Sequence, residues 1–204
     1  MSMFEAGLKE LGVRLPDEAI EGMLSYIDMM TKWNRVYNLT AIRDREKMIS
    51  HHLLDSLSVL AYLEGKTFAD IGSGGGLPGI PLAIACPDSE FTLVESNQKK
   101  SNFLNQCRIE LGLRNVRVEA RRVEDVSGHF DCVISRAFAD AAEFVSLSRH
   151  LLAEGGMLAA MKGRDPEGEL ARLPEDVEIV KVIRLEVPFV EGERHLVIMK
   201  TKSE

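Results

Sequence analysis

The sequence predicts an α/β fold: a mixed, mostly parallel sheet with helices on both faces and a helical N-terminal extension. From residue 66 onward, short apolar runs alternate with helical segments, a pattern typical of a parallel sheet covered on both faces. Two β-type runs separated by residues 189–193 then predict an antiparallel pair. Residues 1–65 carry only helical patterns and loops.

The chain of 204 residues, 45% of them apolar, is long enough for one domain with a sizeable core and too short for two full domains. We therefore expect one compact unit, with residues 1–65 as an extension packed on an α/β core of residues 66–204. The absence of a long apolar run or a signal-peptide pattern predicts a cytoplasmic protein, and we expect a monomer. Three cysteines without C-x-x-C spacing predict buried thiols, with no disulfide or metal site.

Helical signals define the extension. A first helix is expected over residues 3–12. Pro16 and Asp17 then open a second helix that runs to residue 38, because such residues favour the first helical turn. Asp44 is a candidate N-cap for a third helix.

Strands and helices alternate in the predicted core. We expect strands at 67–72, 90–96, 116–125 with its exit loop, 130–137, 157–163, 177–188 and 194–201. We expect helices at 79–86, 98–113 and 141–156, the last closed by glycines at its end.

The loop FADIGSGGGLPGIPLAIA (68–85) lies between the first strand and a helix, where open α/β sheets bind ligands. Gly74, Gly76 and Gly79 fit the dinucleotide fingerprint G-x-G-x-x-G, although a tight turn alone also satisfies it. The second pattern, Asp70-x-Gly72-x-Gly74-x-Gly76, is that of S-adenosylmethionine (AdoMet)-dependent methyltransferases. AdoMet carries a cationic sulfonium and an amino group, which a carboxylate suits electrostatically.

Two later features bear on this choice. The next strand ends in Glu95, where an acidic side chain binds ribose hydroxyls in both enzyme classes. The terminal hairpin resembles the reversed last strand of the seven-stranded methyltransferase sheet, which favours AdoMet over a nicotinamide cofactor. NAD binding is kept as a weaker alternative.

Six motifs occur in order along the chain: KWNRVYNLTAIRD (32–44), HHLLDSL (51–57), DIGSGGGLPGIPLAI (70–84), VESNQKKSNFL (94–104), CVISRAFA (132–139) and MKG (161–163). Together they resemble the RsmG (GidB) family of ribosomal RNA small-subunit methyltransferases, over about residues 4–200. The resemblance implies a Rossmann-like class I AdoMet-dependent methyltransferase. It also implies methylation of guanine N7 in the decoding-site loop of 16S rRNA, with the small ribosomal subunit as partner.

The family's cofactor contacts fall on Gly72, Leu77, Val123, Glu124 and Arg136. The general methyltransferase pattern adds Asp70, Gly74, Gly76 and Glu95. Relatives often carry Ala or Pro within the glycine loop and Phe near its end. They also often carry Arg at the position of His51, which puts an RNA contact of this residue in question.

Guanine N7 has a free lone pair and no proton, so no catalytic base is predicted. After the fourth strand the chain reads Ser135-Arg136-Ala137-Phe138, whereas amine methyltransferases commonly carry Asp/Asn-Pro-Pro-aromatic there. Arg136 is a candidate contact for the AdoMet carboxylate, a phosphate or guanine O6; the alternative is an ion pair with Asp140.

A net charge of −7 argues against a nucleic-acid partner, but basic residues gather locally at Lys32, Arg35, Arg43, Arg45 and Lys47. This block favours RNA over a small acceptor. The candidate substrate contacts are Arg35, Asn38, Arg43, His51, Arg136 and Lys162.

Other roles stay open at this point. Trp33 suits either base stacking or core packing. His51 and His52 are better explained as hydrogen-bonded structural residues than as metal ligands, and Asp55 is a candidate partner for either. The functional alternatives are an AdoMet methyltransferase with a different acceptor and a non-catalytic ribosome assembly factor.

Overall fold

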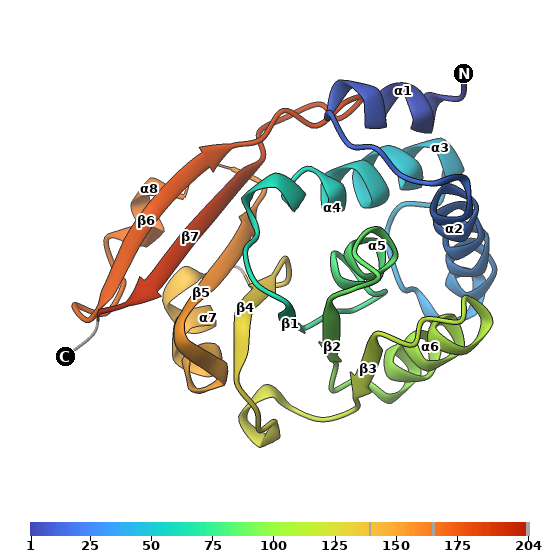
Figure 1. Cartoon of the computed structure of the whole chain (residues 1–204). Helices are drawn as coiled ribbons and strands as arrows, with labels where there is room; N and C mark the ends of the chain where they lie inside the picture. The colour runs from blue at the N-terminus through green and yellow to red at the C-terminus, as the bar shows by residue number, and fades with distance from the viewer. Residues whose placement is uncertain (139, 165, 203–204) are drawn as a thin grey trace.

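The computed structural model describes residues 1–138, 140–164 and 166–202, and within them one sheet has seven strands in the order β3-β2-β1-β4-β5-β7-β6 (Figure 1). The strands are β1 (Thr67–Ile71), β2 (Glu90–Val94), β3 (Val116–Glu119), β4 (Phe130–Ser135), β5 (Leu152–Lys162), β6 (Val177–Arg184) and β7 (His195–Thr201). β1 to β5 are parallel, whereas β7 lies antiparallel between β5 and β6. The predicted mixed sheet is confirmed.

The helices are α1 (Met3–Glu10), α2 (Asp17–Tyr37), α3 (Arg45–Met48), α4 (Asp55–Leu57), α5 (Gly79–Ala85), α6 (Gln98–Glu110), α7 (Ala141–Ser148) and α8 (Glu167–Leu170). A π-helical segment, Ile49–Leu54, joins α3 to α4. Asp44 caps α3 as predicted, because its Oδ1 accepts a hydrogen bond from the Lys47 N–H at 2.8 Å.

The sheet separates two hydrophobic layers. One face packs against helices α1 to α6, with Phe4, Tyr26 and Phe103 fully buried there. The other face packs against α7 through Phe144 and Val145. Helices therefore cover both faces, and the carboxyl ends of the parallel strands are left as an edge on which side chains can gather.

The expected helix over 141–156 is wrong in its second half. α7 ends at Ser148, a 3₁₀ turn follows at Arg149–Leu151, and β5 begins at Leu152. Gly155 has a φ of +71°, which belongs to an irregular start of this strand rather than to a helix end. The short helix α8 was not predicted. The motif at 132–139 ends on Ala139, which lies outside the described residues.

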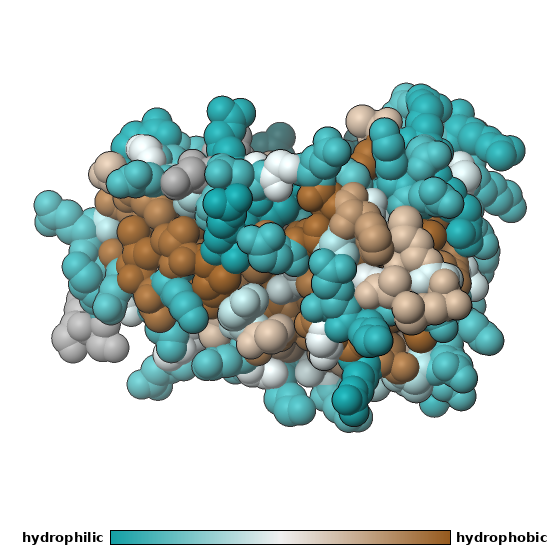
Figure 2. Space-filling model, turned by 90° about the horizontal axis from the view of Figure 1, so that it is seen from above, coloured by the Kyte–Doolittle hydropathy of each residue, from teal (hydrophilic) through white to brown (hydrophobic). Residues whose placement is uncertain are grey.

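The hairpin end of the molecule carries apolar surface. Figure 2 shows hydrophobic colour over the side formed by β6 and β7. Strand β6 exposes Ile179 (40%), Val180 (50%) and Val182 (44%). Among the helices of the described residues, none has the length and apolar character needed to cross a membrane.

Candidate cofactor and substrate site

The glycine loop after β1 adopts a backbone that needs glycine. Gly72, Gly74 and Gly76 have φ angles of +69°, +58° and +94°, in the region that side-chain-bearing residues avoid. A Cβ on Gly72 would lie 2.9 Å from the Cβ of Ala137, and one on Gly76 would lie 2.6 Å from Ile80. The loop therefore packs tightly against the end of β4 and the start of α5.

Glu95 holds this loop from the neighbouring strand. Its side chain accepts hydrogen bonds from the Gly74 N–H and the Asn97 N–H, each at 2.8 Å. The residue is 8% exposed. Two backbone donors thus fix the position of the Glu95 side chain at the point where β2 ends.

A cavity of about 240 Å³ opens beside this carboxylate. Four of the predicted cofactor residues, Gly72, Glu95, Val123 and Glu124, line it together with Phe138. An acidic group next to apolar side chains suits a nucleoside, because the carboxylate accepts from ribose hydroxyls while the apolar groups contact the base. Gly74, Gly76 and Leu77 are not among the lining residues; they belong to the loop itself.

Asp70 lies beneath the loop instead of facing this cavity. It is 1% exposed, and its Oδ2 accepts a hydrogen bond from the Gly79 N–H at 3.0 Å. Its Oδ1 has no partner among the described residues. Burial raises the pKa of the Asp70 carboxyl to about 7. Asp70 thus supports the loop and the start of α5 directly, and the cavity only through them.

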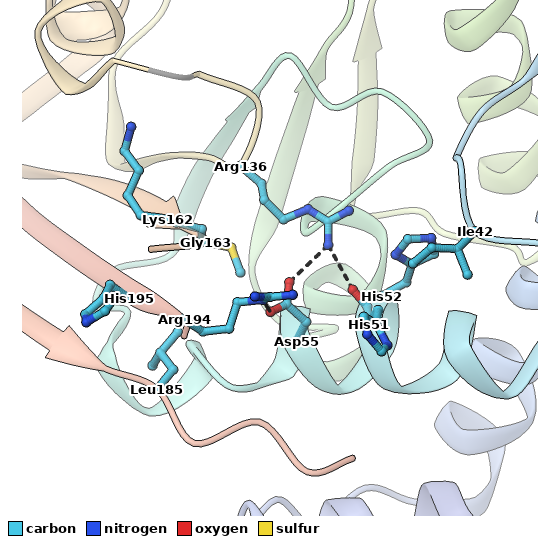
Figure 3. A pocket seen from close by; sticks show the side chains of 11 residues that line it. Ile42, His51, His52, Asp55, Arg136, Lys162, Gly163, Leu185, Arg194 and His195 are labelled. Carbon is cyan, nitrogen blue, oxygen red and sulfur yellow. Dashed lines mark hydrogen bonds and ion pairs between the residues drawn. The ribbon is translucent and has the colours of Figure 1, made fainter. Parts of the chain in front are cut away.

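Arg136, directly after β4, forms a charged cluster with Asp55 and Arg194 (Figure 3). Arg136 Nη1 donates to Asp55 Oδ2 at 3.0 Å and to the His51 carbonyl at 3.1 Å. Arg194 Nε donates to Asp55 Oδ1 at 3.2 Å. The carboxylate of Asp55 is only 3% exposed and joins the two arginines.

This cluster corrects two sequence-based interpretations. Asp140 pairs with Arg172 at 2.6 Å and not with Arg136. Asp55 pairs with arginines and not with a histidine. Arg194 was not predicted at all, because it lies 139 positions from Asp55 and no motif surrounds it.

A second cavity of about 320 Å³ lies over this cluster and is lined by His51, His52, Asp55, Arg136, Lys162 and Arg194, among others. A third, of about 500 Å³, shares Arg136, Met161, Lys162 and Gly163 with the second and Phe138 with the first. The three cavities therefore adjoin along the carboxyl edge of the sheet.

Lys162 and the histidines are held by local contacts. The Lys162 ammonium donates to the Phe138 carbonyl at 3.0 Å and to Glu169 at 3.1 Å, so its side chain points away from Asp55 (Figure 3). His51 Nδ1 lies 2.8 Å from Ser50 Oγ. His52 Nε2 lies 2.9 Å from Thr40 Oγ1, and burial lowers the pKa of His52 to about 4.

The predicted RNA contacts of the extension lie around the loop at 38–44. Arg43 Nη2 donates to Asn38 Oδ1 at 3.4 Å, and both residues, like Arg35, are exposed. Leu39 of the same loop lies against Gly75: a Cβ on Gly75 would be 3.8 Å from it. Asn38 and Arg43 are therefore in a loop that contacts the glycine loop.

The aromatic residues of the basic block have different environments. Trp33 is half-buried and packs on α6, with its ring centroid 5.5 Å from that of Phe103, which favours the core-packing alternative. Tyr37 is 38% exposed, and the Lys99 ammonium lies 5.9 Å from its ring centroid. Across the described part of the chain, no group of His, Cys, Asp or Glu side chains is arranged to hold a metal ion.

Comparison with known proteins adds the family. Residues 19–197 match the family model "GidB: rRNA small subunit methyltransferase G". A relative from Neisseria gonorrhoeae (strain NCCP11945), named ribosomal RNA small subunit methyltransferase G, is 54% identical over 199 residues, which are 97% of this chain and 96% of that relative.

Solved structures share the fold at low sequence identity. A ribosomal protein L11 methylase from Lactobacillus delbrueckii subsp. bulgaricus has a TM-score of 0.56 and 17% identity, over 78% of this chain and 80% of that chain. Pyrococcus horikoshii TYW2 in complex with MeSAdo has a TM-score of 0.53 and 15% identity, over 68% of this chain and 58% of that chain. These neighbours support a Rossmann-like methyltransferase fold. With the family model and the near-full-length relative, we conclude that this chain belongs to the GidB family of ribosomal RNA small subunit methyltransferases.

Proposed function

We propose that this protein transfers a methyl group from AdoMet to N7 of a guanine in 16S rRNA, within the decoding-site loop. The observation that carries the proposal is a set of three cavities, of which the third shares lining residues with both of the others. The first has the lining of a nucleoside site, which includes Glu95, and the second is lined by the arginines Arg136 and Arg194. Membership of the GidB family and the name of its relatives supply the substrate class.

The residues of the first cavity fit AdoMet. Glu95 is the acceptor for the ribose hydroxyls, and Val123 and Phe138 contact the adenine. Gly72 lines this cavity and has no side chain, so its backbone can approach the ligand closely; a Cβ there would also collide with Ala137. The P. horikoshii structure with MeSAdo, a methylthio-adenosine compound by its printed name, supports an adenosine ligand for this fold.

Methyl transfer to guanine N7 requires the protein to orient the reactants but not to supply a base. Bound AdoMet supplies the methyl group: the N7 lone pair forms the new N–C bond, the S–C bond breaks with its electron pair passing to sulfur, and the positive charge moves to the purine. Because N7 carries no proton, no residue has to act as a base. The site works by holding N7 in line with the methyl group, and such orientation is worth up to about 7–11 kcal/mol.

The predicted substrate contacts outside the cofactor cavity are assigned to rRNA binding. Arg35, Asn38 and Arg43 are available for phosphates around the mouth of the site, where exposed cations add salt-dependent affinity. Arg136 faces the substrate cavity. Lys162 contributes indirectly: its ammonium donates to the Phe138 carbonyl and to Glu169, and it thereby fixes the segment that follows β4. The protein acts as a cytoplasmic monomer on the small ribosomal subunit.

The test is methyl transfer from radiolabelled AdoMet to 30S subunits that lack the native modification, followed by mass mapping of 16S rRNA. One new N7-methylguanosine in the decoding-site loop is the expected result. Label at another nucleotide, or on a protein, would assign a different acceptor. AdoMet binding without any label would favour the non-catalytic assembly role.

A further inference from the structure

We propose that the cavity over the Asp55–Arg136–Arg194 cluster is the pocket for the target guanine base, and that Arg194 is a specificity-determining residue that binds guanine O6. This inference rests on the proposed function and names the protein groups that would recognise its acceptor. We call this cavity the base pocket; its polar lining includes His52, Asp55, Arg136 and Arg194.

The base pocket lies where a methyl acceptor has to be. Arg136 follows Ser135, whose hydroxyl donates to the Ile71 carbonyl at 2.7 Å, so the end of β4 is fixed beside the start of the glycine loop. Ala137 packs against Gly72. The 500 Å³ cavity lies between the base pocket and the cofactor cavity: it shares Arg136 and Lys162 with the former and Phe138 with the latter. A purine in the base pocket can therefore turn its N7 toward the cofactor.

The donors of the pocket match one edge of guanine. Next to N7, guanine presents the acceptor O6, whereas adenine presents the N6 amino donor. A guanidinium has five N–H donors, and the described contacts of Arg194 use only Nε, toward Asp55, and Nη1, toward the Glu193 carbonyl. Donors on Arg194 thus remain for O6, while N7 stays free to react. The same donors would face the amino group of adenine and disfavour it.

An acceptor for the opposite edge is also present. His52 is 4% exposed, and its Nδ1 has no hydrogen-bond partner among the described residues. Thr40 Oγ1 accepts from the Ile42 N–H at 3.1 Å and lies 2.9 Å from His52 Nε2. With the proton on Nε2 donated to Thr40, Nδ1 is left as an unpaired acceptor. Because this atom is buried, the His52 ring has to turn toward the base pocket before the N1–H or N2–H of guanine can donate to it. An unsatisfied buried nitrogen in a polar cavity is costly without such a partner.

Asp55 is the positioning residue of this pocket. Its two carboxylate oxygens hold Arg136 and Arg194 separately, at 3.0 Å and 3.2 Å. These arginines come from the segment directly after β4 and from the segment before β7, so one buried carboxylate sets the spacing of donors from distant parts of the chain. A buried, paired carboxylate fixes guanidinium groups far better than an exposed one.

The first experiment compares Arg194→Gln, Arg194→Lys and the control Arg184→Gln in initial rates on 30S subunits that lack the modification. Arg184 is an arginine of the same hairpin, with 66% of its side chain exposed. We expect Arg194→Gln to lower kcat/KM by about ten- to hundredfold, Arg194→Lys to lower it less, and Arg184→Gln to leave it unchanged. Affinity for S-adenosylhomocysteine, measured by calorimetry, should stay equal in all variants, which also confirms folding.

A wild-type rate for Arg194→Gln would overturn the proposal, as would a loss of S-adenosylhomocysteine affinity that matches the loss of rate.

The second experiment measures nucleotide binding in the base pocket independently of methyl transfer. Protein with ¹⁵N-labelled histidine and saturating S-adenosylhomocysteine is titrated with guanosine 5′-monophosphate or adenosine 5′-monophosphate, and His52→Gln identifies the resonance. We expect the guanosine nucleotide to shift His52 Nδ1 in the wild type but not in Arg194→Gln, and the adenosine nucleotide to have no effect. Equal shifts with both nucleotides, or none, would overturn the pocket even if 16S rRNA is methylated. A selective shift without rRNA methylation would support the pocket and contradict the proposed function.

Discussion

The carboxylate of Glu95 fixes the glycine loop through Gly74, whose N–H donates to Oε2 at 2.8 Å. The other oxygen accepts from Asn97 N–H. One side chain therefore shapes the loop and forms the edge of the cofactor cavity, so the two roles are lost together when it is removed.

We accordingly expect Glu95→Ala to weaken AdoMet binding. Hydrogen bonds to a charged group contribute about 1.5–3 kcal/mol, which corresponds to a loss of affinity of about ten- to hundredfold by calorimetry. Glu95→Gln should lose less, because its amide oxygen still accepts one backbone hydrogen bond. Unchanged affinity in Glu95→Ala would remove this residue from the cofactor site.

The double variant Arg35→Ala, Arg43→Ala should behave in the opposite way. Neither residue lines the cofactor cavity, so AdoMet affinity should be retained, while the KM for 30S subunits rises and its dependence on salt becomes shallower. Arg14→Ala with Arg184→Ala, two exposed arginines outside the block at 31–52, is the matched control. A similar rise in KM for the control pair would mean that general charge, and not this loop, attracts the rRNA.

Two buried groups should give stability opposite dependences on pH. Burial raises the pKa of Asp70 from 3.8 to about 7, so the folded state holds a proton that the unfolded state has lost, and stability falls as pH rises between these values. Burial lowers the pKa of His52 from 6.5 to about 4, so the unfolded state holds the extra proton, and stability falls as pH drops from 6.5 to 4. Between about pH 4.5 and 6 the two slopes, each up to about 1.4 kcal/mol per pH unit, largely cancel.

Single variants should reveal how each group changes the free energy of unfolding with pH, measured by urea denaturation at pH 4.5 and 6. Asp70→Asn leaves the His52 contribution, so the free energy of unfolding should increase with pH relative to the wild type. His52→Gln leaves the Asp70 contribution, so it should decrease with pH. Two variants with the same slope as the wild type would show that neither group changes its proton binding on folding.

Gly79 offers a test of packing beneath the loop. A Cβ there would lie 2.3 Å from Leu93 Cδ2 and 2.7 Å from Asp70 Oδ2, so Gly79→Ala should destabilise the protein by about 1–3 kcal/mol. Gly22→Ala is the control within α2, where the new Cβ would meet Ile84 at an ordinary 3.8 Å; it should stabilise by about 0.5–1 kcal/mol. Chemical denaturation of both variants measures the contrast, and equal effects would contradict the packing argument.

The strands could be predicted because their signals are local. β1, β2, β3, β4, β6 and β7 each lie within their predicted ranges, and the second half of β5 does too, whereas its first half, Leu152 to Gly156, was expected to be helical. The end of α7 could not be predicted in this way. The pattern from Arg149 to Glu154 is compatible with a helix. In the structure Leu152 instead pairs with Phe130 of β4, so β5 begins there. A contact between residues this far apart in sequence leaves no local pattern from which it could be predicted.

The same distinction applies to the site. Glu95 and the glycines follow from one motif and one strand end, so sequence spacing was enough to bring them together. The sequence suggests Asp140 as the alternative partner of Arg136 because the two are near each other along the chain. Asp55 and Arg194 approach Arg136 only after the extension and the hairpin have packed on the core. Asp70 belongs to the same motif at the end of β1, but its burial and its hydrogen bond with the Gly79 N–H depend on packing that spacing does not reveal.

The position of β7 between β5 and β6 has a consequence for synthesis on the ribosome. The strand that completes the sheet is translated after both of its neighbours, and Arg194 precedes it by one residue. A nascent chain that has not yet reached residue 194 therefore keeps β5 and β6 without their shared partner and lacks the Arg194 part of the Asp55 cluster. The charged cluster that lines the base pocket is thus assembled among the last parts of the molecule, so a ribosome must translate past residue 194 before it has made a protein able to modify other ribosomes.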